Sequence, residues 1–209
     1  MRQFVFNIAA IRPRARFLPG LFGPFFVIMN YFEVFELKPL LSIDLKALER
    51  KFHELSRQYH PDYFTTASAD EKGRALRMTA LLNDAYRTLR HPTRRVEYLL
   101  SLYGLKADGS KVPQALLMEV FEINEQLEEL KMSGKASPEQ LKSIREQIAE
   151  KRDKFDRQLD EASQDWDKLL SARSPEADLK KQLSRIAEIL SESSYIHNLE
   201  EELESLNHA

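Results

Sequence analysis

One tripeptide of this 209-residue chain has residue types and spacing that suit chemistry, His60-Pro61-Asp62. An imidazole and a carboxylate on either side of a proline can form an acid–base pair or, on an exposed turn, a recognition element. The sequence offers no third group to orient the imidazole and no pattern that would form a pocket, so we favour recognition over catalysis. The structural alternative is a plain turn with an Asx-type hydrogen bond.

The composition excludes several other kinds of site. The chain has no cysteine, which rules out disulfides, thiol catalysis, cysteinyl zinc sites and iron–sulfur clusters held by thiolates. Its five histidines are scattered, and it has no GxGxxG, P-loop, GxSxG or HExxH motif. We therefore expect no catalytic residue, no metal and no cofactor.

Two amphipathic helices must position the tripeptide. The first begins at Ser42 or Asp44 and ends at His60, because Pro61 disfavours helical dihedral angles in the residue before it. The second runs from about residue 69 to 90, and a short helix from Pro92 ends at Gly104. Apolar residues recur every three or four positions, which predicts an antiparallel hairpin with a docked third helix. The stripes are Leu45, Leu48, Phe52, Leu55 and Tyr59, then Ala75, Met78, Leu82, Ala85 and Leu89, then Val96, Leu99, Leu100 and Tyr103.

The remainder of the chain predicts a linker and three longer helices. Residues 104–112 contain two glycines and no periodicity, which is typical of a linker. Helices are expected over about 113–132, from Ser137 to about 172, and from Ser174 to near the C-terminus. At the start of the second, Ser137 and Gln140 form a capping box, and Pro138 occupies the first helical position. No stretch alternates with a period of two. The fold class is therefore all-α, with a helical hairpin domain at 29–103 and a three-helix bundle at 113–209.

Charge is distributed unevenly between these parts. The whole chain has a net charge of −2, but residues 31–103 have a net charge of +2 and residues 113–209 carry 13 basic and 22 acidic side chains, a net charge of −9. Such an acidic half would be repelled by phosphate, so we expect no nucleic-acid partner. The asymmetry indicates two domains with different protein partners.

The first 28 residues differ from the rest, with four arginines and no acidic residue. Their apolar run, residues 17–28, is interrupted by prolines and glycines and is too short to span a membrane. We expect no membrane association, and we interpret residues 1–28 as a disordered extension or a mis-assigned start, with the natural start at Met29. The composition also suits an organelle transit peptide.

The residues around the tripeptide resemble the J-domain, and among J-domains they are most similar to the HscB-type co-chaperones of iron–sulfur cluster assembly. The resemblance begins at Met29, is strong over about 75 residues and continues as a pattern through the acidic bundle. It implies a protein that is not an enzyme, whose J-domain at 29–103 stimulates ATP hydrolysis by a DnaK/HscA-type chaperone. The matching motifs are Tyr31-Phe32, Arg57-Gln58-Tyr59-His60-Pro61-Asp62, Leu89-Arg90-His91-Pro92 and Arg95-Val96-Glu97-Tyr98-Leu99-Leu100.

The resemblance also implies which residues meet the chaperone. Beside the tripeptide, the helix before the loop retains Arg50, Lys51 and Arg57, the basic face of a J-domain, although Glu49, His53 and Glu54 dilute it. This dilution matches the HscB subgroup and indicates a dedicated chaperone partner. Phe52, Leu55 and Tyr59 are expected to be core residues only.

The first bundle helix contains a second candidate surface. Its core stripe is Leu116, Val120, Ile123, Leu127 and Leu130, and at about 100° per residue Leu117, Met118 and Phe121 lie off that stripe. Leu117 and Phe121 can instead pack against the J-domain or the third bundle helix, whereas Met118 lies among glutamates. In HscB-type proteins the matching segment binds the iron–sulfur scaffold, which implies an IscU-type partner and these scaffold-binding residues: Leu117, Met118, Phe121, Glu122, Glu125, Glu129 and, on the last helix, Tyr195.

Two alternatives remain open at this point. The protein can be a J-domain protein with a different client, or a helical adaptor in which the tripeptide is accidental. Eukaryotic relatives often carry paired CxxC motifs, which this chain lacks, so the resemblance is to the bacterial form and implies a cytoplasmic protein.

Overall fold

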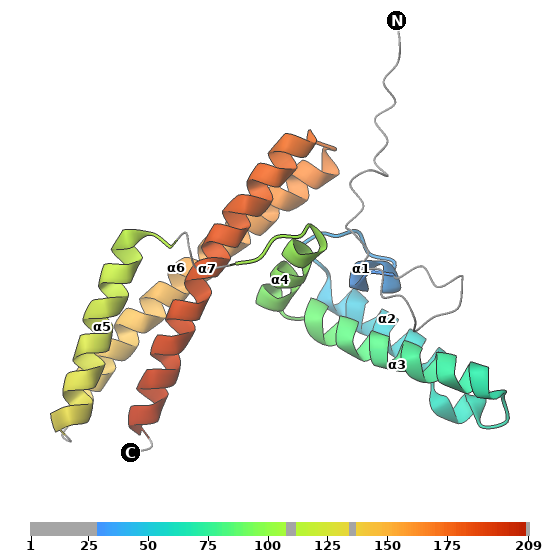
Figure 1. Cartoon of the computed structure of the whole chain (residues 1–209), viewed down its shortest axis with the longest axis horizontal. Helices are drawn as coiled ribbons and strands as arrows, with labels where there is room; N and C mark the ends of the chain where they lie inside the picture. The colour runs from blue at the N-terminus through green and yellow to red at the C-terminus, as the bar shows by residue number, and fades with distance from the viewer. Residues whose placement is uncertain (1–28, 108–111, 134–136, 208–209) are drawn as a thin grey trace, which may run out of the picture. The chain divides into compact units, whose positions relative to one another are not determined.

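The computed structural model describes residues 29–107, 112–133 and 137–207, and every regular element in these ranges is helical (Figure 1). The all-α prediction is confirmed. The contacts divide the chain between Leu105 and Lys106 into two compact units. Residues 1–28 and part of the predicted linker, 108–111, lie outside the described ranges.

The first unit is built on a hairpin of α2 (Leu45–Gln58) and α3 (Ala69–Leu89). Asp44 caps α2, and its carboxylate accepts hydrogen bonds from the backbone N–H groups of Lys46 and Ala47 at 2.9 and 3.1 Å. The chain then passes through a short 3₁₀ helix, η2 (Pro61–Phe64), before α3 begins with a capping box formed by Ser68 and Glu71. The predicted loop thus contains an ordered turn, which is too short to show a periodicity in the sequence.

Two smaller helices complete this unit, α1 (Tyr31–Val34) and α4 (Pro92–Leu102). The sequence analysis did not predict α1, because four residues cannot show the helical period. Phe32 of α1 is fully buried, and Tyr31 stacks on Tyr98 of α4 with ring centroids 4.2 Å apart. The backbone N–H of Tyr31 donates to the Tyr98 hydroxyl at 2.8 Å, and burial raises the pKa of Tyr98 to about 12. Tyr31 and Tyr98, which come from two of the motifs that carry the resemblance, therefore connect the first and last helices of this unit.

Burial in the hairpin is less complete than its apolar stripes predict. Leu48 is the only residue of the α2 stripe that is fully buried, and Phe52, Leu55 and Tyr59 are half-buried. Leu45 is 48% exposed, so its expected place in a buried stripe is wrong. A small unit has too few side chains to cover each helix on all sides of its stripe. Phe52 is covered on one face by Tyr86 of α3, whose ring stacks on it with centroids 4.3 Å apart.

The second unit consists of α5 (Gln114–Ser133), α6 (Pro138–Ser171) and α7 (Glu176–Asn207). The predicted capping box at Ser137 is present, and Gln140 returns its side chain to the Ser137 backbone. α6 and α7 form a long hairpin, and α5 packs beside one half of it (Figure 1). A shared core joins the three helices, made of Val120, Ile123, Leu127, Leu130, Ile144, Ile148, Leu199 and Leu203.

Two ion pairs hold α5 against this hairpin. Lys151 of α6 pairs with Glu119, and Lys131 of α5 pairs with Glu202 of α7 at 2.6 Å. With these pairs and the shared core on its inner side, α5 turns its core stripe inward and leaves its opposite face outside. None of the described helices has the length and apolar character needed to cross a membrane.

Candidate functional sites on two helical units

The His60-Pro61-Asp62 turn lies at the end of α2. His60 is the N-cap of η2, and its Nδ1 accepts a hydrogen bond from the backbone N–H of Asp62 at 3.3 Å. Pro61 occupies the first position of η2, where its missing N–H costs nothing. The backbone N–H of Tyr63 donates to the His60 carbonyl at 3.0 Å. The tripeptide is therefore a closed turn, held by hydrogen bonds that Asp62 and Tyr63 donate to His60.

This geometry decides which chemical groups the turn offers. A nitrogen that accepts an N–H carries no proton, so neutral His60 has its proton on Nε2. The imidazole is 54% exposed and the Asp62 carboxylate is 83% exposed, with Oδ2 3.5 Å from Nδ1. The turn thus presents an N–H donor and a carboxylate acceptor side by side to solvent, an arrangement suited to recognition of another protein.

An exposed aromatic ring that the sequence analysis did not select adjoins this turn. Tyr63 is 74% exposed, and its ring meets the imidazole of His60 edge-on with centroids 6.2 Å apart. Its position directly after the tripeptide was the signal available in the sequence.

The basic residues of α2 are not equally available. Arg50 and Arg57 are exposed and form no ion pair with any residue in the described ranges. Lys51 is held between Glu36 and Glu54, with N–O distances of 3.3 and 3.8 Å, and its side chain is only 27% exposed. Among the three basic residues predicted to meet the chaperone, the two arginines therefore carry the charge that is unpaired within the described ranges.

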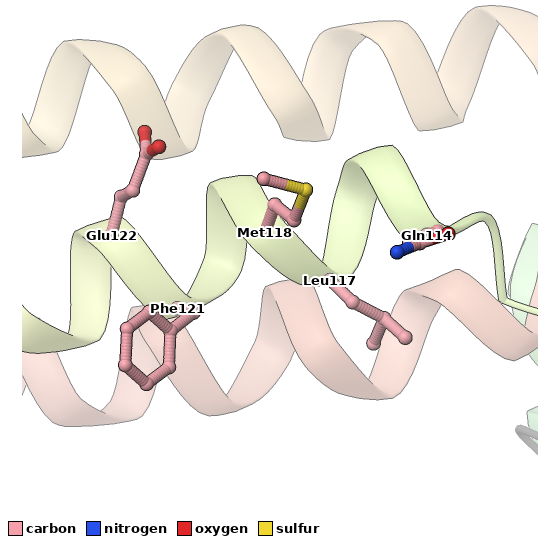
Figure 2. Close-up of a pocket in the computed structure, with 5 residues that line it drawn as sticks. All are labelled: Gln114, Leu117, Met118, Phe121 and Glu122. Carbon is pink, nitrogen blue, oxygen red and sulfur yellow. The ribbon is translucent and has the colours of Figure 1, made fainter.

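The outer face of α5 carries the second predicted group of residues. Leu117, Met118 and Phe121 are 40, 60 and 62% exposed. With Gln114 and Glu122 they line a shallow depression, where Met118 and Glu122 rise on one edge and Leu117 and Phe121 on the other (Figure 2). These positions follow the i, i+3, i+4, i+7, i+8 spacing of one helix face. Neither Leu117 nor Phe121 is buried within its own unit, so the alternative that they pack against the third bundle helix is not supported.

The same face continues as a row of acidic groups. Glu122, Glu125 and Glu129 are all exposed and lie on the side of α5 opposite its core stripe. We call the surface formed by Gln114, Leu117, Met118, Phe121, Glu122, Glu125 and Glu129 the α5 outer face. Gln114 was not selected from the sequence as part of this surface, although it lies four residues before Met118 and therefore on the same face of the helix.

Tyr195 lies elsewhere in the unit. It is half-buried on α7 and packs against the shared core of the bundle rather than lining the depression on α5. A scaffold-binding role for Tyr195 therefore has less geometric support than the same role for the residues of the α5 outer face.

Neither site has the composition of a metal centre. Within the described ranges, no three histidine, aspartate or glutamate side chains lie in a group that could hold a metal ion. The two surfaces therefore offer hydrogen bonds, charge and apolar area, the means by which one protein binds another.

Comparison with known proteins identifies the family. The family model described as the HSCB C-terminal oligomerisation domain matches residues 112–204. A solved structure of the chaperone HscB from Vibrio cholerae is similar over 86% of this chain and 98% of its own, with 29% identity and a TM-score of 0.60. Residues 112–204 therefore belong to the HSCB C-terminal domain family, and the chain as a whole is similar to HscB co-chaperones. The crystal structure of the human co-chaperone protein HscB shares the fold, at 24% identity and a TM-score of 0.63 over 90% of this chain and 93% of its own.

These matches confirm the resemblance to HscB-type co-chaperones seen in the sequence. They agree with the all-helical fold, and HscB co-chaperones are a class without enzymatic activity of their own.

Proposed function

We propose that this HscB-family co-chaperone uses the His60-Pro61-Asp62 turn to stimulate ATP hydrolysis by a DnaK/HscA-type chaperone. We propose further that the α5 outer face binds an IscU-type iron–sulfur scaffold, so that the scaffold is brought to the chaperone. The observation that carries the proposal is the exposed, closed turn with a donor and an acceptor side by side. The resemblance to the bacterial form supports a cytoplasmic location for this exchange.

The basic residues of α2 and the turn itself have different roles in contacting the chaperone. Arg50 and Arg57 provide unpaired positive charge, which attracts an acidic surface and mainly speeds the encounter. The turn itself provides directional hydrogen bonds that require close contact. Lys51, already held by two glutamates, contributes less to the attraction than either arginine. These residues therefore serve binding, and the turn serves stimulation.

The α5 outer face has the anatomy of a protein interface. Exposed Met118 and Phe121 form an apolar centre, and the glutamates form a charged rim. A partner suited to this face has an apolar patch next to basic residues. The net charge of −9 on residues 113–209 repels nucleic acid and favours such a protein.

The test is an ATPase assay with purified chaperone. His60→Gln and Asp62→Asn are each expected to abolish stimulation and to change the free energy of unfolding by less than about 0.5 kcal/mol, since both side chains are exposed. His197→Gln, which changes an exposed histidine in the other unit, is the matched control and should stimulate normally. Stimulation at the wild-type level by either variant of the turn would refute the proposed function.

A further inference from the structure

The peptide group between Tyr59 and His60 is the point where the chain leaves α2. Tyr59, the C-cap of α2, has φ −104° and ψ 16°, and His60 is extended with φ −63° and ψ 130°. Both polar atoms of this peptide group are held. The Tyr59 carbonyl accepts a hydrogen bond from the hydroxyl of Thr79 at 3.0 Å, and the His60 N–H donates to the Arg57 carbonyl at 3.3 Å. The plane of this peptide therefore has a defined orientation.

The rest of the turn, as far as Tyr63, is coupled to this peptide group. The hydrogen bonds from Asp62 N–H to His60 Nδ1 and from Tyr63 N–H to the His60 carbonyl close the turn on itself. A closed turn behaves as one body, so the orientation of its first peptide sets the direction in which the imidazole and the carboxylate point. The bond from Thr79 comes from α3, 20 residues along the chain, and ties this orientation to the opposite helix of the hairpin.

We propose that Thr79 is a positioning residue for the His60-Pro61-Asp62 turn, acting through the Tyr59 carbonyl. This inference rests on the proposed function of the turn. The last carbonyls of a helix have no partner inside it, and one that loses its side-chain donor turns toward water. Without the Thr79 hydroxyl, the peptide group is held on one side only. The turn then samples orientations in which His60 and Asp62 no longer meet the chaperone together.

The effect should appear in the stimulated rate more than in binding. Arg57 contacts this peptide group only through its backbone carbonyl, and the charged side chains of Arg50 and Arg57 extend from α2 itself, so encounter with the chaperone is unchanged. Loss of an interaction that is needed only during stimulation lowers the maximal rate of ATP hydrolysis. It leaves the co-chaperone concentration that gives half of this rate nearly unchanged. This separation distinguishes positioning from a general loss of structure, which would lower the concentration of active protein.

Three variants test the role of the hydroxyl. Thr79→Val keeps the shape and removes the hydroxyl, Thr79→Ser keeps the hydroxyl, and Thr88→Val makes the same change on α3 at a threonine whose hydroxyl bonds to no described residue. Thr79→Val should lower maximal stimulation by about threefold or more, with a half-saturating concentration within about twofold of the wild type. Thr79→Ser and Thr88→Val should remain close to the wild type. Amide hydrogen exchange at His60 and Asp62 should accelerate in Thr79→Val, while exchange at Leu82 in the core stays slow.

Each outcome bears on the inference in a defined way. Wild-type maximal stimulation by Thr79→Val would overturn it, and so would an equal loss in Thr79→Ser, because the hydroxyl would not be the cause. Exchange that accelerates throughout the hairpin would also overturn it, because the loss would then come from unfolding. His60→Gln, assayed alongside, separates the two proposals. If His60→Gln still stimulates ATP hydrolysis, the proposed function of the turn fails. If His60→Gln does not stimulate but Thr79→Val stimulates like the wild type, only the role of Thr79 is refuted.

Discussion

Replacement of Leu117, Met118 and Phe121 by alanine separates binding on the α5 outer face from packing inside the bundle. The three side chains are 40, 60 and 62% exposed in the free protein. Full burial of such a side chain contributes about 1.5–3 kcal/mol, and scaling this by the exposed fractions gives about 2–5 kcal/mol for covering all three. Because about 1.4 kcal/mol corresponds to a factor of ten in affinity, the triple variant should bind an IscU-type scaffold at least about tenfold more weakly.

Stability and location provide the controls for this experiment. The triple variant should melt close to the wild type, whereas Leu127→Ala, at a fully buried position of the same helix, should lose about 2–5 kcal/mol of unfolding free energy. Met132→Ala changes an 89% exposed methionine about 21 Å along α5 from Met118, beyond the last glutamate of the α5 outer face, and should leave binding unchanged.

The assay is calorimetric titration with scaffold, combined with thermal melting of each variant. Unchanged affinity in the triple variant would refute the interface. A large fall in its melting temperature would show that these side chains belong to the core, and equal weakening by Met132→Ala would show that the effect is not specific to the α5 outer face.

Two further predictions concern charge. Charge reversal at Glu122 and Glu125 should slow scaffold association and reduce the salt dependence of the association rate, because rim charges act mainly on the encounter. Stopped-flow association rates at two salt concentrations test this, and rates equal to those of the wild type would contradict it. The hydrogen bond from Lys151 lowers the pKa of Glu119 below its ordinary value of 4.5, so the pair stabilises the fold fully above pH 4.5 and less as the pH falls through the lower pKa of the folded state. The difference in unfolding free energy between wild type and Glu119→Gln, measured with urea, should accordingly be constant near neutral pH and shrink in acid; a difference that grows in acid would refute the assignment.

Much of the fold could be predicted because its signals are local. The capping box of Ser137 and Gln140 and the proline at position 138 mark the start of α6 within four residues of sequence. The apolar period of α5 identified the buried stripe, and the same angular arithmetic placed Met118 outside it. Short elements escaped, because α1 and η2 have four residues each and cannot show a period.

Contacts between distant residues escaped for a different reason. Lys51 is paired with Glu36, 15 positions earlier, and Thr79 donates to a carbonyl 20 positions earlier. A helical period relates residues of one helix only, and these two contacts cross from one element to another. Tyr195 shows the same limit, because its side chain packs against a core to which three helices contribute.

The sequence by itself determined the longer helices, most of their buried stripes and the location of the tripeptide between two of them, because caps, prolines and periodicity act over a few residues. Only the tertiary structure decided which predicted site residues remain available: Arg50 and Arg57 are unpaired within the described ranges while Lys51 is held, and Met118 is outside the bundle while Tyr195 is packed against its core. The physical reason is that availability depends on how helices dock, and docking is set by the summed packing and charge of residues far apart in the chain.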